Sequence, residues 1–374
     1  MLKENFKDAA IGVIYDEAGN FRFSLVRRKY GNEDTDYTTW KRYTYFVEPH
    51  AFNKTFKKRV GGCLFSDLDE IQESFSVEKL SKQFYKELSN WYFASLDKVE
   101  FPNERNENEY TLKANSMIRL VTRLMFAWFM KQKGLIPKEL FDQNEMQSLL
   151  NYKDKTGSTY YKAILQNLFF ATLNTPVNNG RKWVKDQYGS QQYYRCKRFI
   201  NNENRFMELM RDIPFLNGGL FENLDIVQTE DKEKGLEKKD IRVDCFSDNP
   251  KNETRLKVPD FLFFGTRRAD ITEYLPDEKY NNIEVKGIID LLSQYEFTID
   301  ENTADDMEVA LDPELLGPVF ENLLASYNPE TQNTARKESG SFYTPRPVVD
   351  YMVKESLAYY ISETTEIDSN TIPP

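Results

Sequence analysis

The sequence predicts an α+β fold that is mainly helical and carries a small antiparallel β region at its N-terminus. β-branched and alternating apolar runs are concentrated in the first 60 or so residues, whereas from about residue 69 apolar residues recur at three- and four-residue steps. The chain of 374 residues is 40% hydrophobic, with 27 Phe and 22 Tyr, so it can bury a sizeable core.

The β region begins with a predicted hairpin. Residues 9–16 and 21–28 are β-branched or alternating runs, and Gly19 and Asn20 lie in the segment that joins them. Residues 42–49 alternate in the same way and predict a third strand. We therefore expect a small antiparallel sheet within residues 1–66.

Three helices are predicted next. Residues 77–96 carry apolar side chains at helical spacing behind Ser76, which is an N-cap candidate. A stronger stripe runs from Leu112 to Phe129, and a third helix is expected near residues 158–173. Stripes this apolar are typical of core-packing faces, so no chemistry is assigned to them.

Three more helices are predicted toward the C-terminus. Residues 281–297 place apolar side chains loosely on one helical face, and residues 312–327 do so more clearly. The last helix follows Thr344, a good N-cap, with Pro345 at its first position.

Composition excludes several classes of protein. The net charge of −10 argues against indiscriminate binding to nucleic acid, which depends on phosphate neutralisation. No window approaches eighteen apolar residues, so no membrane span is expected. Three scattered cysteines and one histidine make no zinc pattern and fit a reducing cytoplasm.

A local basic segment stands out against the acidic total. Residues 180–198, GRKWVKDQYGSQQYYRCKR, mix cations with Trp and Tyr, a combination that can pair phosphates and stack bases. The alternative is a solvated loop in a tyrosine-rich protein. The candidate DNA-binding residues are Arg181, Lys182, Lys185, Arg195, Lys197 and Arg198.

A second pattern resembles the metal-binding set of many nucleases. Pro259-Asp260 is followed by Glu284-Val285-Lys286, and such carboxylates can hold a divalent cation while the lysine orients water. This chemistry needs Glu284 and Lys286 on a strand, where both project from the same face. Because the apolar spacing of residues 281–297 predicts a helix, we disfavour a nuclease that uses these residues.

The segment GSFYTP, residues 340–345, leads into the last predicted helix. The amides at a helix N-terminus and its positive dipole end suit a carboxylate or phosphate, and Phe342 or Tyr343 could supply an apolar wall. On these residues alone, a well-capped helix without a ligand is the alternative.

The surrounding stretch also resembles a known family. LDPELLGPVFENLLASYNPETQNTARKESGSFYTPRPVVDYMVKESLAYYI, from residue 311, is similar to the segment before the cofactor-binding core of large adenine-specific DNA methyltransferases. These include type IIG restriction-modification enzymes and phage-defence methylases. The family's Gly-x-[Phe/Tyr]-Tyr-Thr-Pro motif maps onto Gly340, Phe342, Tyr343, Thr344 and Pro345.

The resemblance implies a domain order and a cofactor. Residues 1–66 would be a remnant of a nuclease domain, 67–310 a helical connector, and 311–374 the incomplete start of an α/β class I methyltransferase domain. Phe342, Tyr343, Thr344 and Pro345 would contact S-adenosylmethionine, the methyl donor for adenine in double-stranded DNA. Mg²⁺ would be needed only if a nuclease domain is attached.

Two motifs of the family are absent from the sequence. Neither its glycine-rich cofactor loop nor its Asn-Pro-Pro-Tyr loop, which holds the flipped adenine, is found. We therefore expect the N-terminal part of a longer enzyme or one subunit of a split one, with no catalytic or metal-binding residue of its own. A non-catalytic DNA-binding or specificity subunit is the alternative, and a nuclease using Asp260, Glu284 and Lys286 is the second.

Overall fold

The fold is given for the residues that the computed structural model describes. These are residues 8–28, 40–48, 53–177, 181–185, 193–216, 219–226, 241–295, 297, 306–308, 311 and 346–364. The chain divides into two units, residues 1–316 and 317–374, and each is described by itself. The predicted cofactor contacts at 342–345 and the predicted helix at 312–327 lie outside the described residues.

The N-terminal sheet has the order β1-β2-β3-β6. Strands β1 (Ala9–Tyr15), β2 (Phe21–Arg27) and β3 (Lys41–Val47) form an antiparallel meander, and β6 (Asp306–Glu308) pairs in parallel with β3. The β1–β2 turn is closed by Asp16, whose carboxylate accepts from the backbone N–H of Asn20 at 2.9 Å. The predicted hairpin and third strand are thus confirmed.

This sheet has its own small core. Leu25, Tyr45 and Val47 on β2 and β3 are buried against Phe75 and the helices α1 (Lys54–Arg59) and α2 (Leu68–Ser74). The Tyr45 hydroxyl donates to the carbonyl of Ser74 at 2.7 Å, so the ring is anchored at both ends.

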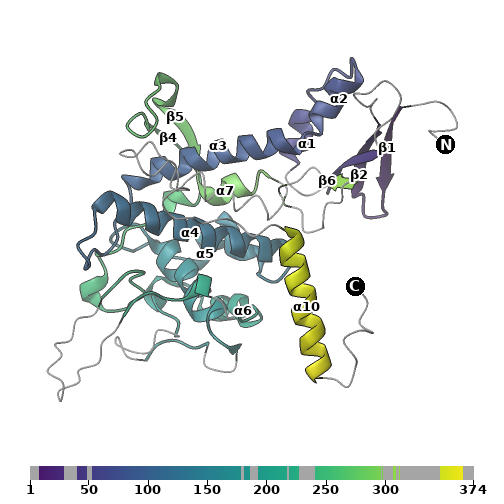
Figure 1. Ribbon diagram of the computed structural model, residues 1–374. Helices are drawn as coiled ribbons and strands as arrows, with labels where there is room; N and C mark the ends of the chain where they lie inside the picture. Colours follow the sequence, from purple (N-terminus) through teal and green to yellow (C-terminus); the bar gives the residue numbers. More distant parts are fainter. Residues whose placement is uncertain are drawn as a thin grey trace. The chain divides into compact units, whose positions relative to one another are not determined.

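Two long helices dominate the rest of the first unit. Helix α3 (Val77–Leu96) is capped by the Ser76 hydroxyl, and α4 (Glu109–Gln132) by the Asn108 side chain, which accepts from the N–H of Thr111. Figure 1 shows the two helices side by side, and their residues are in contact. The predicted helices over these residues are confirmed.

The third predicted helix is also present, with π-type hydrogen bonding in its segments η2 (Tyr161–Leu165) and η3 (Asn167–Leu173). Every residue of both segments is buried. Shorter helices complete this region. They are α5 (Gln143–Leu149), α6 (Glu203–Arg211) and the 3₁₀ turns Lys138–Phe141, Lys197–Phe199, Gly219–Phe221, Pro250–Asn252, Asp260–Leu262 and Glu278–Tyr280.

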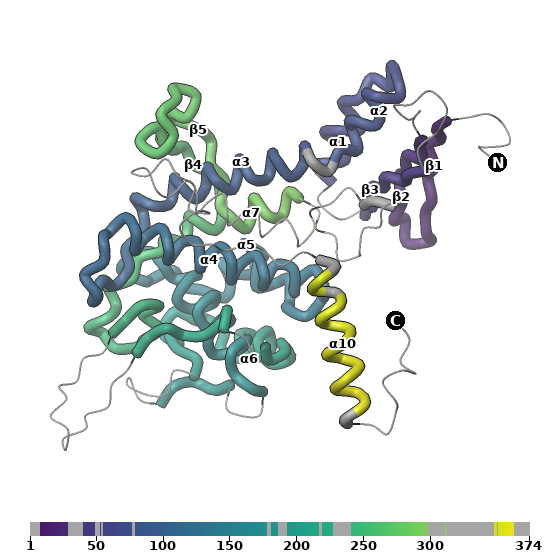
Figure 2. Tube along the Cα trace, in the orientation of Figure 1, coloured from purple at the N-terminus to yellow at the C-terminus, as the bar shows by residue number. Residues whose placement is uncertain are grey.

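The helix predicted for residues 281–297 is wrong. Ile283–Lys286 forms strand β5, which pairs antiparallel with β4 (Thr266–Ala269), and only Ile288–Leu292 is helical, as α7. The β-branched Ile283 and Val285 favour the strand, and Gly287 separates it from the helix. Both β5 and α7 pack against α3, and Figure 2 shows α7 running alongside it.

The second unit contains helix α10 (Arg346–Thr364), which is the described part of the last predicted helix. Taken together, the described residues confirm the expected α+β class, mainly helical with an N-terminal antiparallel sheet. None of the helices in the described ranges is long and apolar enough to cross a membrane.

Gly287 is required because the backbone of another segment passes directly over it. A Cβ atom here would lie 2.4 Å from the carbonyl carbon of Phe263 and from the backbone nitrogen of Phe264. We expect Gly287→Ala to lower the free energy of unfolding by about 1–3 kcal/mol through overpacking. Urea denaturation measures this, with Gly12→Ala as control because a Cβ at Gly12 meets nothing within 4 Å. Equal stability of the two variants would contradict the close approach.

Candidate nucleic-acid interface

The basic and aromatic segment is built on helix α6. The backbone N–H of Val184 donates to the carbonyl of Tyr194, and the N–H of Tyr194 to the carbonyl of Lys182, both at 3.0 Å. The Trp183 ring stacks on Phe206 of α6 with 4.9 Å between ring centroids. Residues 181–185 are therefore held in place by main-chain pairing and by an aromatic contact.

Lysines occupy the exposed side of this segment. The Lys182 ammonium lies 5.1 Å from the ring centroid of Tyr193, and both Lys182 and Lys185 are exposed. Within the described part of the chain, neither lysine forms an ion pair. An ammonium beside an accessible tyrosine ring can meet a phosphate while the ring meets a base.

Lys197 and Arg198 are exposed but already paired with acids. The Lys197 ammonium lies 2.6 Å from the Glu203 carboxylate, and the Arg198 guanidinium lies 2.9 Å from that of Asp248. The Lys197–Glu203 pair is exposed on both sides and contributes at most about 1 kcal/mol, so Lys197 can exchange its partner for a phosphate. Asp248 is largely buried and also accepts from the backbone N–H of Cys196, so Arg198 is held more firmly.

Arg181 points into the fold. Its guanidinium donates to the carbonyls of Met210 and Arg211, at the end of α6, and to that of Thr172, at the end of η3. Cations near helix C-termini are stabilising, because the last carbonyls of a helix point toward them. Burial lowers the pKa of Arg181. The side chain therefore joins two helix ends.

Arg195 is buried, with 3% of its surface exposed. Its guanidinium carbon lies 5.0 Å from the ring centroid of Phe246, and its backbone N–H donates to the side chain of Asn167. Burial lowers the pKa of this guanidinium as well. The proposed DNA contact thus depends on the exposed lysines and on Arg198, and nothing in the local sequence separates Arg195 from its exposed neighbours.

Asp260, the first residue of the nuclease pattern, acts as a helix cap. Its carboxylate accepts from the backbone N–H of Tyr160 at 2.7 Å, at the start of the helix that continues into η2. Burial raises the pKa of Asp260 to about 7, while hydrogen bonds from the backbone N–H groups of Tyr160 and Thr159 lower it in part. A capping role explains the position of this carboxylate without a metal.

Glu284 and Lys286 do lie on a strand, on the side opposite the buried Val285. This is the arrangement that the nuclease pattern needs, and the helix expected from sequence was the reason for disfavouring it. The Lys286 ammonium donates to the Gln294 side chain at 2.5 Å. In the described ranges, no group of three or more His, Cys, Asp or Glu residues could hold a metal ion.

Comparison with curated proteins gives a distant relative. The chain is 23% identical over 319 residues to a protein of Methanocaldococcus jannaschii provisionally named as a type II restriction enzyme and methyltransferase. The match covers 84% of this chain but only 20% of the relative, so the chain spans about a fifth of that protein's length. No protein-family model matches the chain, and no solved structure matches it.

The raised pKa of Asp260 predicts a pH dependence of stability. The folded state holds a proton up to about pH 7, whereas the unfolded carboxyl releases it near its ordinary value of 3.8. Between these values the folded state binds more protons, so the free energy of unfolding falls as pH rises, by at most about 1.4 kcal/mol per pH unit. Urea denaturation from pH 5 to 7 should show this slope, and Asp260→Asn, which keeps an acceptor for Tyr160, should flatten it. An identical slope in the variant would contradict the assignment.

The lysines predict a separable effect on DNA binding. Replacing Lys182 and Lys185 together by Gln should weaken duplex binding and lower the slope of log K against log salt by about 0.9 for each phosphate that the protein no longer neutralises. Fluorescence anisotropy at several salt concentrations measures both quantities. Arg268→Gln is the control for each single Lys→Gln substitution, because Arg268 is exposed on the separate β4–β5 pair of strands. Arg181→Gln should instead lower thermal stability, because Arg181 joins two helix ends. A stable Arg181→Gln protein with weakened DNA binding would assign Arg181 to DNA contact and not to the fold.

Proposed function

We propose that this chain is the N-terminal and connector part of an adenine-specific DNA methyltransferase of type IIG character, in a cytoplasmic restriction-modification or phage-defence system. The observation that carries the proposal is the Gly-x-Phe-Tyr-Thr-Pro string at residues 340–345, directly before helix α10. The similarity to the M. jannaschii protein supports it, because that protein is named as both a restriction enzyme and a methyltransferase.

In this proposal, S-adenosylmethionine donates its methyl group to the exocyclic amine of adenine in DNA. Phe342, Tyr343, Thr344 and Pro345 contribute one wall of the cofactor site, residues 311–374 begin the methyltransferase domain, and residues 67–310 form the connector. The remaining walls come from a C-terminal methyltransferase and target-recognition part or from a separate subunit. Magnesium enters only with a nuclease domain, of which residues 1–66 would be a remnant.

The exposed cations of the basic segment are the proposed DNA contacts. Lys182 and Lys185 are exposed, and the Lys182 ammonium lies over the Tyr193 ring. Lys197 and Arg198 follow in the turn Lys197–Phe199, and the Lys197 ammonium lies 5.7 Å from the ring centroid of Trp183. Phosphate contacts of this kind position a protein on DNA and leave the choice of sequence to other residues.

The cofactor wall is tested by substitution in a protein that carries the complete methyltransferase domain. Tyr343→Ala and Thr344→Ala should each weaken S-adenosylmethionine affinity by about tenfold, the loss of roughly one ring contact or hydrogen bond. Calorimetry measures the affinity, and thermal unfolding of the same variants is the control. A large loss of thermal stability with unchanged affinity would favour the alternative, in which these residues only cap the helix and bind no cofactor.

Three assays, of methyl transfer, DNA binding and DNA nicking, separate the proposal from its two alternatives. Transfer of labelled methyl groups to adenine-containing duplex by the complete protein supports the methyltransferase, and the 374-residue chain alone should transfer none. DNA binding without methyl transfer by the complete protein would indicate a non-catalytic specificity or scaffold subunit. Magnesium-dependent nicking that disappears in Glu284→Ala would indicate the nuclease.

A further inference from the structure

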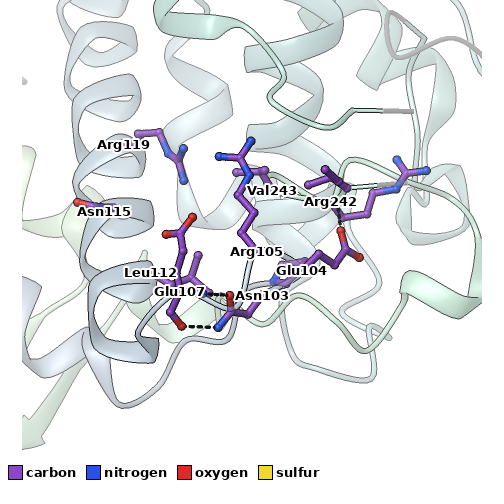
Figure 3. A pocket seen from close by; sticks show the side chains of 11 residues that line it. Asn103, Glu104, Arg105, Glu107, Leu112, Asn115, Arg119, Arg242 and Val243 are labelled. Atoms are coloured by element: carbon purple, nitrogen blue, oxygen red, sulfur yellow. Dashed lines mark hydrogen bonds between the residues drawn. The ribbon is translucent and has the colours of Figure 1, made fainter. Parts of the chain in front are cut away.

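A hollow lies where the start of α4 meets two loops. It has a volume of about 210 Å³ and is bordered by residues 102–107, by Leu112, Asn115 and Arg119 of α4, and by residues 241–243. One water needs only about 10–15 Å³ of such a volume, so the hollow admits a much larger group. Figure 3 shows the side chains that line it.

Some of the charges at this hollow are neutralised within the fold. The Glu104 carboxylate accepts from the Arg255 guanidinium and from the backbone N–H of Arg242. The Arg242 guanidinium in turn pairs with the buried carboxylate of Asp225. These groups build the wall and are not free to bind a ligand.

Three charged side chains remain. Figure 3 shows the Arg119 guanidinium and the Glu107 carboxylate directed toward each other, with the Arg105 side chain rising beside them. Arg119 donates to the Ser116 hydroxyl at 3.2 Å, which uses one of the five donors of its guanidinium. In the described ranges, Arg105 and the Glu107 carboxylate form no hydrogen bond or ion pair. Two guanidinium groups and one carboxylate give this set a charge of +1.

The backbone under these side chains is fixed. The Asn103 side chain accepts from the N–H of Glu107 at 2.8 Å and donates to its carbonyl at 2.7 Å, which closes the loop. Asn108 then caps α4, which carries Arg119. The cations therefore stand on a rigid base, and binding would cost little ordering of the backbone.

We propose that Arg105 and Arg119 form a phosphodiester site that takes one backbone phosphate of DNA. Guanidinium groups match phosphate oxygens in geometry, and a diester carries one negative charge, equal and opposite to that of the set. Glu107 lowers the affinity for more highly charged anions such as a phosphate monoester. The choice of DNA as the source of the phosphate rests on the proposed function.

The experiment measures duplex binding by the 374-residue chain, by three variants of the site and by one control variant. Arg105→Gln and Arg119→Gln should each weaken affinity for a 20-base-pair duplex by about tenfold, the loss of a charge-assisted hydrogen bond. Because the two arginines share one phosphate, the two substitutions together should reduce the salt slope by at most about 0.9. Glu107→Gln should strengthen binding by several-fold, because it removes a like charge. Arg268→Gln is the control of equal charge change, and Arg105 is exposed, so its variant is expected to fold.

The outcomes separate this inference from the proposed function. Opposite effects of Arg105→Gln and Glu107→Gln, with Arg268→Gln unchanged, support the site. Duplex binding that falls with Lys182 and Lys185 but not with Arg105 overturns the site and leaves the proposed function intact. Arginine-dependent binding of deoxyadenosine monophosphate or inorganic phosphate, with duplex affinity unaffected, also overturns it. Failure of the complete protein to methylate DNA, with the duplex results retained, counts against the methyltransferase alone.

Discussion

The buried guanidinium of Arg123 is the interaction on which much of the helical region depends. It lies inside α4 with 3% of its surface exposed, and it donates to the carbonyls of Leu220 and Glu222 and to the Asp244 carboxylate, all within 2.7–2.8 Å. One side chain thus joins a long helix to two segments about 100 residues further along the chain. Removing either member of a buried ion pair costs about 3–5 kcal/mol, because the other charge is left uncompensated.

A second buried carboxylate extends this connection. Asp225 accepts from the backbone N–H groups of Val243, Cys245 and Phe246, so it fixes the backbone beside Asp244. The Gln166 side chain donates to the carbonyl of Asp244, which ties the same backbone to the buried helix η2–η3. Residues 242 and 243, one wall of the hollow that Arg105 and Arg119 line, are therefore held by the network that also holds the core. A ligand site on such a base needs little reorganisation on binding.

The sequence predicts the elements whose causes are local. Period-2 and period-3.6 patterns with caps such as Ser76 and Asn108 specify the hairpin and the long helices, since each cap bonds within three residues of itself. The sequence pattern predicted a helix where Ile283–Lys286 forms a strand. Four residues are too few to distinguish the period of a strand from that of a helix, and the partner strand β4 lies elsewhere in the sequence.

The candidate sites were harder to predict, because their contacts come from distant parts of the chain. Arg181 and Arg195 lie in a basic and aromatic segment typical of DNA contacts. Their partners, however, are helix ends and an aromatic ring that only folding brings close. Arg105 and Arg119 carry no motif at all. What separates a structural arginine from a free one is the set of carbonyls and carboxylates around it, and these come from distant segments.

The acidic total charge limits how such cations can act on DNA. With a net charge of −10, the chain as a whole repels a polyanion, but screening at physiological salt confines this to about 8 Å. Attraction must then arise from cations within contact distance, and several of those described, such as Arg123 and Lys162, are already paired with acids inside the fold. Four of the proposed DNA contacts form no ion pair within the described residues, and their surroundings differ. Lys182 and Lys185 are exposed, whereas Arg105 and Arg119 line the hollow. Few contacts against a repulsive background predict weak and strongly salt-dependent duplex binding by this chain.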